Sequence, residues 1–116
     1  MIQVFHNPSC SKSRCAIDNL EIKNTEYEII DYLNTHLSAQ LLHDVLGKLG
    51  MKPIEILRTG EQKFKELGLS IDDGRSDTEW IQIMIENPIL IERPIIIKDD
   101  KAVIGRPPEN IETLFK

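Results

Sequence analysis

The sequence has no long hydrophobic run, and cysteine is scarce in it. No apolar stretch approaches the roughly 20 residues that a membrane-spanning helix requires. Only 2 of the 116 residues are cysteine, Cys10 and Cys15, which excludes a framework of extracellular disulfides. A basic segment ahead of an apolar stretch is also missing at the start, so we expect no secretory signal peptide and a cytoplasmic location.

An excess of basic residues is likewise absent. The sequence has 19 Asp and Glu residues against 14 Lys and Arg, which gives a formal net charge of −5. Because nucleic-acid binding needs clustered basic side chains, we expect neither a nucleic-acid nor a membrane partner. Hydrophobic residues make up 41% and charged residues 28% of the chain, an ordinary globular composition. The length predicts a single domain over residues 1–116, which we expect to be a monomer.

The first third of the chain has the pattern of a strand–helix–strand unit. Residues 2–5 (IQVF) form a short apolar run that predicts a buried strand. The turn signal Asn7-Pro8 ends it, and a helix is expected to begin near Cys10. Asn24 can supply the left-handed residue that ends this helix, and residues 27–32 (YEIIDY) predict a second strand.

The middle of the chain changes to helical periodicity. Ser38 and Ser76 can each cap the start of a helix, because their hydroxyl oxygens can accept backbone N–H groups of the first turn. Gly50 and Pro88 mark where these two helices end. Shorter helical turns are expected between them, so we predict a helical insertion over approximately residues 36–88.

The last third returns to strands. Residues 95–97 and 102–104 are apolar and flank a polar tetrapeptide, which predicts a β-hairpin. Pro107-Pro108 then begins a terminal helix. Without the insertion, this order of elements is that of a thioredoxin-like fold. The predicted fold class is therefore α/β, a thioredoxin-like fold with a mixed four-stranded sheet and a helical insertion.

Cys10 is the best candidate for a reactive residue. It is expected at a helix N-terminus, where unpaired N–H groups and the helix dipole favour a thiolate over a thiol. Lys12 and Arg14 add positive charge, the hydroxyl of Ser13 can donate to the sulfur, and His6 lies just upstream. The alternative is a buried, unreactive cysteine, but the polar neighbours favour a reactive thiol that is exposed enough to be attacked.

Cys15 is expected to be a small core residue. It follows Cys10 by five positions, so a Cys-x-x-Cys motif is absent and the two side chains lie on different helix faces. The neighbours Ala16 and Ile17 favour a buried thiol over a resolving one. A zinc site would combine His6 with the two cysteines, but a fourth ligand is not evident, so we expect no metal.

Three arginines lie beside or close to glycine or proline in the sequence: Arg58, Arg93 and Arg106. A planar guanidinium can bind a tetrahedral oxyanion through two parallel hydrogen bonds. Its positive charge also permits an anionic thiolate to attack an anionic substrate. Each arginine alone fits a surface charge equally well, but together with Cys10 the three predict an oxyanion pocket.

The N-terminal motif resembles the signature of a known family. The run His6-Asn7-Pro8-x-Cys10-x-x-Ser13-Arg14 is similar to that of the ArsC family, the glutathione/glutaredoxin-dependent arsenate reductases. Further matching segments cover nearly the whole chain: Leu57-Arg58, Glu66-Leu67-Gly68-Leu69, Asn87-Pro88-Ile89-Leu90-Ile91-x-Arg93-Pro94-Ile95 and Gly105-Arg106-Pro107. No single segment is decisive, but the ordered set is specific.

The resemblance implies an activity, arsenate reductase, and roles for the site residues. It matches Cys10 to the nucleophile, His6 and Ser13 to residues that tune it, and the three arginines to oxyanion ligands. It also implies no bound cofactor, glutathione as co-substrate and glutaredoxin as partner. In thioredoxin-like folds a cis-proline faces the reactive cysteine, and Pro94 is the matching position, so we predict a cis Arg93–Pro94 peptide bond.

Two related groups leave alternatives open. The segments CSKSR and IGRPPE are similar to the YfgD-like branch of the family, so a thiol oxidoreductase acting on another substrate is one alternative. Spx-type regulators, which bind RNA polymerase, share the Arg-Pro-Ile strand entrance. They commonly carry Cys-x-x-Cys, whereas Ser13 stands at the second position here, and Arg106 fits the enzyme better.

Overall fold

The computed structural model describes residues 2–115, and the chain divides into two compact units. The sheet unit consists of the residues up to Thr35 together with those from Arg93 onward. The helical unit consists of residues 36–92. It covers the region in which the sequence predicts an insertion.

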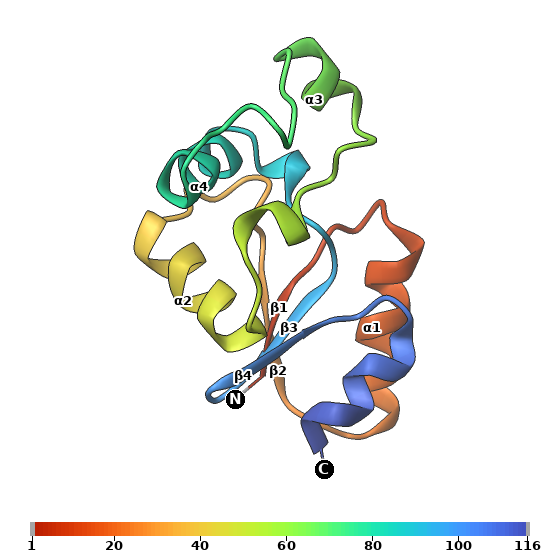
Figure 1. Ribbon diagram of the computed structural model, residues 1–116. Helices are drawn as coiled ribbons and strands as arrows, with labels where there is room; N and C mark the ends of the chain where they lie inside the picture. Colours follow the sequence, from red (N-terminus) through yellow and green to blue (C-terminus); the bar gives the residue numbers. More distant parts are fainter. Residues whose placement is uncertain (1, 116) are drawn as a thin grey trace. The chain divides into compact units, whose positions relative to one another are not determined.

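The sheet unit contains four strands in the order β2-β1-β3-β4 (Figure 1). They are β1 (Ile2–Phe5), β2 (Tyr27–Ile30), β3 (Ile95–Lys98) and β4 (Lys101–Ile104). β1 is parallel to β2 and antiparallel to β3, and β3 and β4 form the predicted hairpin. This mixed sheet, with the order of elements around it, confirms the predicted thioredoxin-like α/β fold.

The core of the sheet unit lies between the sheet and two helices. Figure 1 shows α1 (Ser11–Ile22) and the C-terminal 3-10 helix η3 (Pro108–Phe115) side by side. Because side chains of a strand alternate between its two faces, every second residue of β1 and β3 turns to these helices. The buried cluster so formed contains Ile2, Val4, Ala16, Leu20, Ile96, Ile111 and Leu114. Asn24, with φ of 54°, supplies the predicted left-handed residue after α1.

The helical unit contains three α-helices and two 3-10 helices. These are α2 (Ala39–Leu49), η1 (Pro53–Ile56), α3 (Gln62–Glu66), α4 (Asp77–Glu86) and η2 (Pro88–Leu90). Both predicted N-caps are confirmed, because Ser38 Oγ accepts the Leu41 N–H and Ser76 Oγ accepts the Glu79 N–H. Gly50 ends α2 with φ of 68°, the left-handed conformation that favours glycine.

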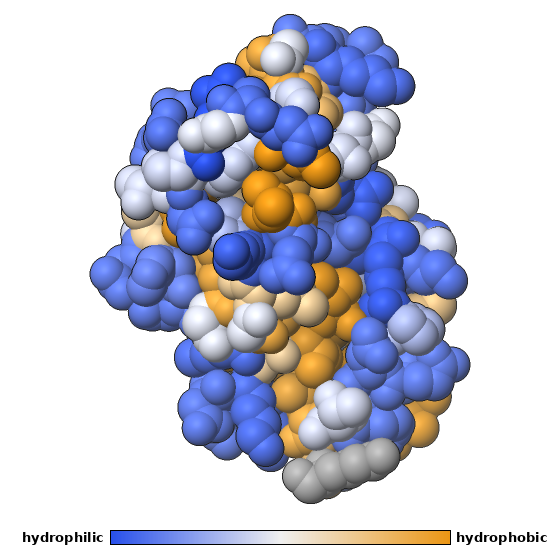
Figure 2. Space-filling view, viewed as in Figure 1, coloured by the Kyte–Doolittle hydropathy of each residue, from blue (hydrophilic) through white to orange (hydrophobic). Residues whose placement is uncertain are grey.

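Polar and apolar side chains both reach the surface. Figure 2 shows charged and polar side chains over much of the visible face, with apolar side chains exposed between them. Large exposed apolar residues include Ile22, Ile29 and Ile71. Among the helices that the structure describes, none is both long and apolar enough to cross a membrane.

Candidate functional site

Cys10 lies at the N-cap of α1, directly after the loop that follows β1. Its backbone is extended, with φ of −99° and ψ of 121°, and its carbonyl oxygen accepts the Arg14 N–H at 3.0 Å. The backbone N–H groups of Lys12 and Ser13, in the first turn of the helix, lower the pKa of the Cys10 thiol. The first turn of the helix therefore favours the thiolate, as the sequence predicts.

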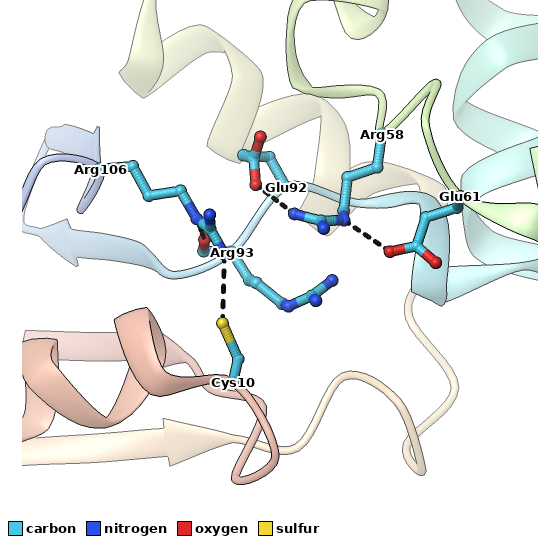
Figure 3. Close-up of polar contacts among 6 residues, drawn as sticks. All are labelled: Cys10, Arg58, Glu61, Glu92, Arg93 and Arg106. Atoms are coloured by element: carbon cyan, nitrogen blue, oxygen red, sulfur yellow. Dashed lines mark hydrogen bonds and ion pairs between the residues drawn. The ribbon is translucent and has the colours of Figure 1, made fainter.

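Two of the three predicted arginines belong to the same unit as Cys10. Arg106 Nη2 donates to Cys10 Sγ at 3.2 Å, and Arg106 Nε donates to the carbonyl oxygen of Arg93 at 2.6 Å (Figure 3). Arg93 also acts on the sulfur through a side-chain hydrogen bond and through its charge. The loop before β3 and the loop after β4 thus bring two guanidinium groups to one thiol.

The pKa of the Cys10 thiol is lowered to about 7. Burial is the largest single influence and raises this pKa, but the Ser13 N–H, the Arg93 side chain and the Lys12 N–H together lower it more. Cys10 is only 7% exposed, and that this is enough for the thiol to react stays a prediction. The same contacts that stabilise the thiolate also cover the residue.

Ser13 connects the first turn of α1 to His6. Its Oγ lies 2.7 Å from His6 Nδ1 and accepts the Asn7 N–H at 2.9 Å. The sequence predicts donation from the Ser13 hydroxyl to the sulfur; in the structure this hydroxyl contacts His6 and Asn7, and the Ser13 backbone N–H lowers the pKa of the thiol. Burial lowers the pKa of His6, and the charge of Arg14 lowers it further. Nδ1 of a neutral His6 ring can accept a hydrogen bond from the Ser13 hydroxyl. The serine oxygen already accepts the Asn7 N–H, so the hydroxyl proton is left to donate to His6.

Arg14 lies differently from the sequence-based expectation. Its side chain is exposed, and Nη1 donates to the carbonyl oxygen of Pro8 at 3.3 Å. Its positive charge acts on His6, whose pKa it lowers. A direct effect of Arg14 on the Cys10 thiolate stays a prediction.

Cys15 is exposed, so the prediction of a buried core residue is wrong. The buried side of α1 is formed by Ser13, Ala16 and Leu20, which recur at helical spacing. Cys15 precedes Ala16 by one residue, a rotation of about 100° around the helix, and this turns its side chain away from the core. Over residues 2–115, no group of three or more His, Cys, Asp or Glu residues could hold a metal ion.

Arg58 belongs to the helical unit and is bound by two glutamates. Arg58 Nε lies 3.0 Å from Glu61 Oε1, and Arg58 Nη1 lies 2.7 Å from Glu92 Oε1 (Figure 3). Its backbone N–H donates to the Leu90 carbonyl oxygen at 2.7 Å. Sequence reasoning missed both carboxylates; the i,i+3 spacing of Arg58 and Glu61 was a signal for the first. That Arg58 binds the same oxyanion as the other arginines stays a prediction.

The predicted cis peptide bond between Arg93 and Pro94 is confirmed, and a second one, not predicted, joins Arg106 to Pro107. Both arginines at the sulfur thus directly precede a cis-proline. Gly105 links the two segments, since its N–H donates to the Pro94 carbonyl oxygen at 2.9 Å.

The four-stranded mixed sheet, with Cys10 at the N-terminus of α1 and Arg106 in contact with its sulfur, belongs to the thioredoxin-like class. The model of the ArsC family matches residues 5–114. The chain therefore belongs to the ArsC family.

Similar proteins include both named reductases and a relative without a stated activity. The chain is 43% identical to the uncharacterized protein YfgD of Escherichia coli over 111 residues, which cover 95% of this chain and 92% of the relative. It is 39% identical to an arsenate reductase of Neisseria meningitidis, with 98% and 97% covered. The solved arsenate reductase of Vibrio cholerae has a TM-score of 0.91 at 37% identity, with 97% of this chain and 96% of that chain covered.

Proposed function

We propose that the protein is an arsenate reductase that uses glutathione and glutaredoxin. The observation that carries this proposal is the contact between Arg106 Nη2 and Cys10 Sγ at 3.2 Å, at a thiol with a pKa of about 7. It combines a nucleophile that is ionised at neutral pH with a side chain suited to a tetrahedral oxyanion. The names of the reductase relatives support arsenate as that oxyanion.

In the first step the Cys10 thiolate attacks the arsenic atom of arsenate. Arg93 and Arg106 supply positive charge beside the sulfur, which offsets the repulsion between two anions. Arg58 is the predicted third ligand, by resemblance to the family. A sulfur–arsenic bond forms, and one arsenate oxygen leaves as water after taking up protons. The product is a Cys10–arsenic(V) adduct.

In the second step a glutathione thiolate attacks the Cys10 sulfur of this adduct. A sulfur–sulfur bond forms while the sulfur–arsenic bond breaks, and its electron pair stays on arsenic. Arsenic(V) is thereby reduced to arsenic(III), released as arsenite. Glutaredoxin then attacks the glutathione sulfur of the mixed disulfide and returns Cys10 as a thiolate. These reductants belong to a reducing cytoplasm, which is the location that we propose.

A coupled assay tests the proposal. It measures arsenate-dependent NADPH oxidation with glutathione and glutaredoxin in one arm and thioredoxin in the other. We expect turnover in the first arm, loss of turnover in Cys10→Ser, and retained turnover in Cys15→Ser, the matched control. Turnover with thioredoxin alone would contradict the proposal that glutathione and glutaredoxin are the reductants. No turnover in either arm would contradict the proposed activity.

A further inference from the structure

Asn110 lies near the start of η3 and contacts the loop that carries Arg106. Its side-chain Nδ2 donates to the Ile104 carbonyl oxygen at 2.9 Å and to the Arg106 carbonyl oxygen at 3.2 Å. An amide nitrogen has two hydrogens, so both donors of this group are used on the loop after β4. The backbone N–H of Asn110 also donates to the Pro107 carbonyl oxygen at 3.0 Å. One residue thus holds this loop at three carbonyl oxygens.

The position of Asn110 is fixed by the core of the sheet unit. Ile111, the next residue of η3, is fully buried and belongs to the same apolar cluster as Ala16 and Leu20 of α1. Cys10 is the N-cap of that helix. The loop and the thiol are therefore attached to one packed core, the loop through Asn110 and the thiol through α1.

Arg106 is held both at its backbone and at its side chain. Its carbonyl oxygen accepts Asn110 Nδ2, and its Nε donates to the Arg93 carbonyl oxygen at 2.6 Å. Between these two anchors the guanidinium reaches the sulfur, where Nη2 lies 3.2 Å from Cys10 Sγ (Figure 3). A misplacement of about 1 Å at a group that positions substrate can lower a rate about a hundredfold. The anchor at the backbone is therefore as relevant to the site as the contact at the sulfur.

We infer, building on the proposed function, that Asn110 is a positioning residue for oxyanion binding. It holds the loop after β4 so that the Arg106 guanidinium stays beside Cys10. An asparagine suits this role because its short side chain offers two donors, whereas serine and threonine offer one and an ionised aspartate offers none. Asn110 itself needs no contact with the oxyanion, since it acts through Arg106.

A double-mutant cycle of Asn110→Ala and Arg106→Lys tests whether Asn110 acts through Arg106. The affinity for sulfate is measured by calorimetry on the full chain; sulfate is a stable tetrahedral dianion, so the measurement does not depend on turnover. We expect affinity about fivefold weaker in Asn110→Ala and about tenfold weaker in Arg106→Lys. The double variant should stay about tenfold weaker than the unchanged protein, because no guanidinium is left to position. A merely structural role would add the two losses, to about fiftyfold.

Thr113→Ala is the matched control for a general weakening of η3. Thr113 Oγ1 donates to the Asn110 carbonyl oxygen at 2.7 Å, so this variant removes a hydrogen bond of the helix and keeps both side-chain bonds from Asn110 to the loop. It should lower the melting temperature and leave the sulfate affinity unchanged. Asn110→Ser keeps one side-chain donor, so its loss of affinity should be smaller than that of Asn110→Ala.

Four results would overturn the inference: no sulfate binding to the unchanged protein, unchanged affinity in Asn110→Ala, additive losses in the double variant, or an equal loss in Thr113→Ala. Urea unfolding shows whether each variant is folded, and if Asn110→Ala does not fold, the same cycle with Asn110→Ser decides. Sulfate binding that depends on Asn110 through Arg106, without arsenate turnover, would leave this positioning role standing and contradict the proposed activity instead.

Discussion

Ser13 Oγ lies 2.7 Å from His6 Nδ1, while the Ser13 backbone N–H lowers the pKa of the Cys10 thiol. The serine therefore acts on the thiolate without its hydroxyl group. This separation has a measurable consequence, because a substitution can remove the hydroxyl and keep the N–H.

Ser13→Ala should leave the pKa of Cys10 near 7 and lower the stability of the fold. The Asn7 N–H loses its acceptor in this variant, which costs about 1–3 kcal/mol in the free energy of unfolding. Urea unfolding measures the stability, and the iodoacetamide rate against pH measures the pKa. A pKa near that of a free thiol would show that the hydroxyl itself tunes the sulfur.

The alkylation rate of Cys10 should rise with pH around a midpoint of about 7. Because the thiolate reacts and its pKa is lowered, roughly a tenth of the thiol is ionised at pH 6 and about nine tenths at pH 8. Cys15→Ser isolates this thiol, and Cys10→Ser isolates the exposed Cys15, which should also react in the native protein. A midpoint above pH 8 for Cys10 would contradict the lowered pKa of this thiol.

Arg106→Lys should weaken oxyanion binding while the fold survives. Lysine keeps the charge but loses the planar pair of donors, and we expect the affinity for sulfate or arsenate to fall about tenfold. Arg75→Lys, in the helical unit and paired with Asp73, is the control. Unchanged anion affinity in Arg106→Lys, measured by calorimetry, would mean that Arg106 is not a ligand.

Gly105→Ala should destabilise the sheet unit by about 1–3 kcal/mol. A Cβ atom at Gly105 would lie 2.9 Å from Ile96 Cδ1 and 2.9 Å from Pro94 Cγ, closer than carbon atoms pack. At Gly47 in α2 a Cβ atom would meet nothing within 4 Å, so Gly47→Ala should stabilise the protein by about 0.5–1 kcal/mol. Equal melting temperatures for the two variants would contradict this packing.

The fold could be predicted from the sequence because its signals are local. Caps such as Ser38 and Ser76 and the left-handed residues Asn24 and Gly50 act within one helical turn, and each is found where predicted. The exposure of Cys15 could not be predicted from its apolar neighbours, because a shift of one residue on a helix changes the face.

The site was predictable in its residue types and less so in its contacts. A cysteine before a helix and arginines beside proline indicate thiolate and oxyanion chemistry. The pairing of Arg58 with Glu92 spans 34 positions, and no local pattern marks it. The contact of the Ser13 hydroxyl with His6, in place of the Cys10 sulfur, could not be predicted without the course of the loop before α1.

The pairing of β1 with β3 sets an order for folding during synthesis on the ribosome. Ile2 pairs with Lys98, so the antiparallel partner of β1 is translated only after the whole helical unit. Until then one edge of β1 lacks its neighbour, and an unpaired edge is a template for aggregation. Nascent chains that stop before Ile95 should therefore be held by chaperones or degraded. Once translation has passed β3, this strand can pair with β1 and cover its free edge.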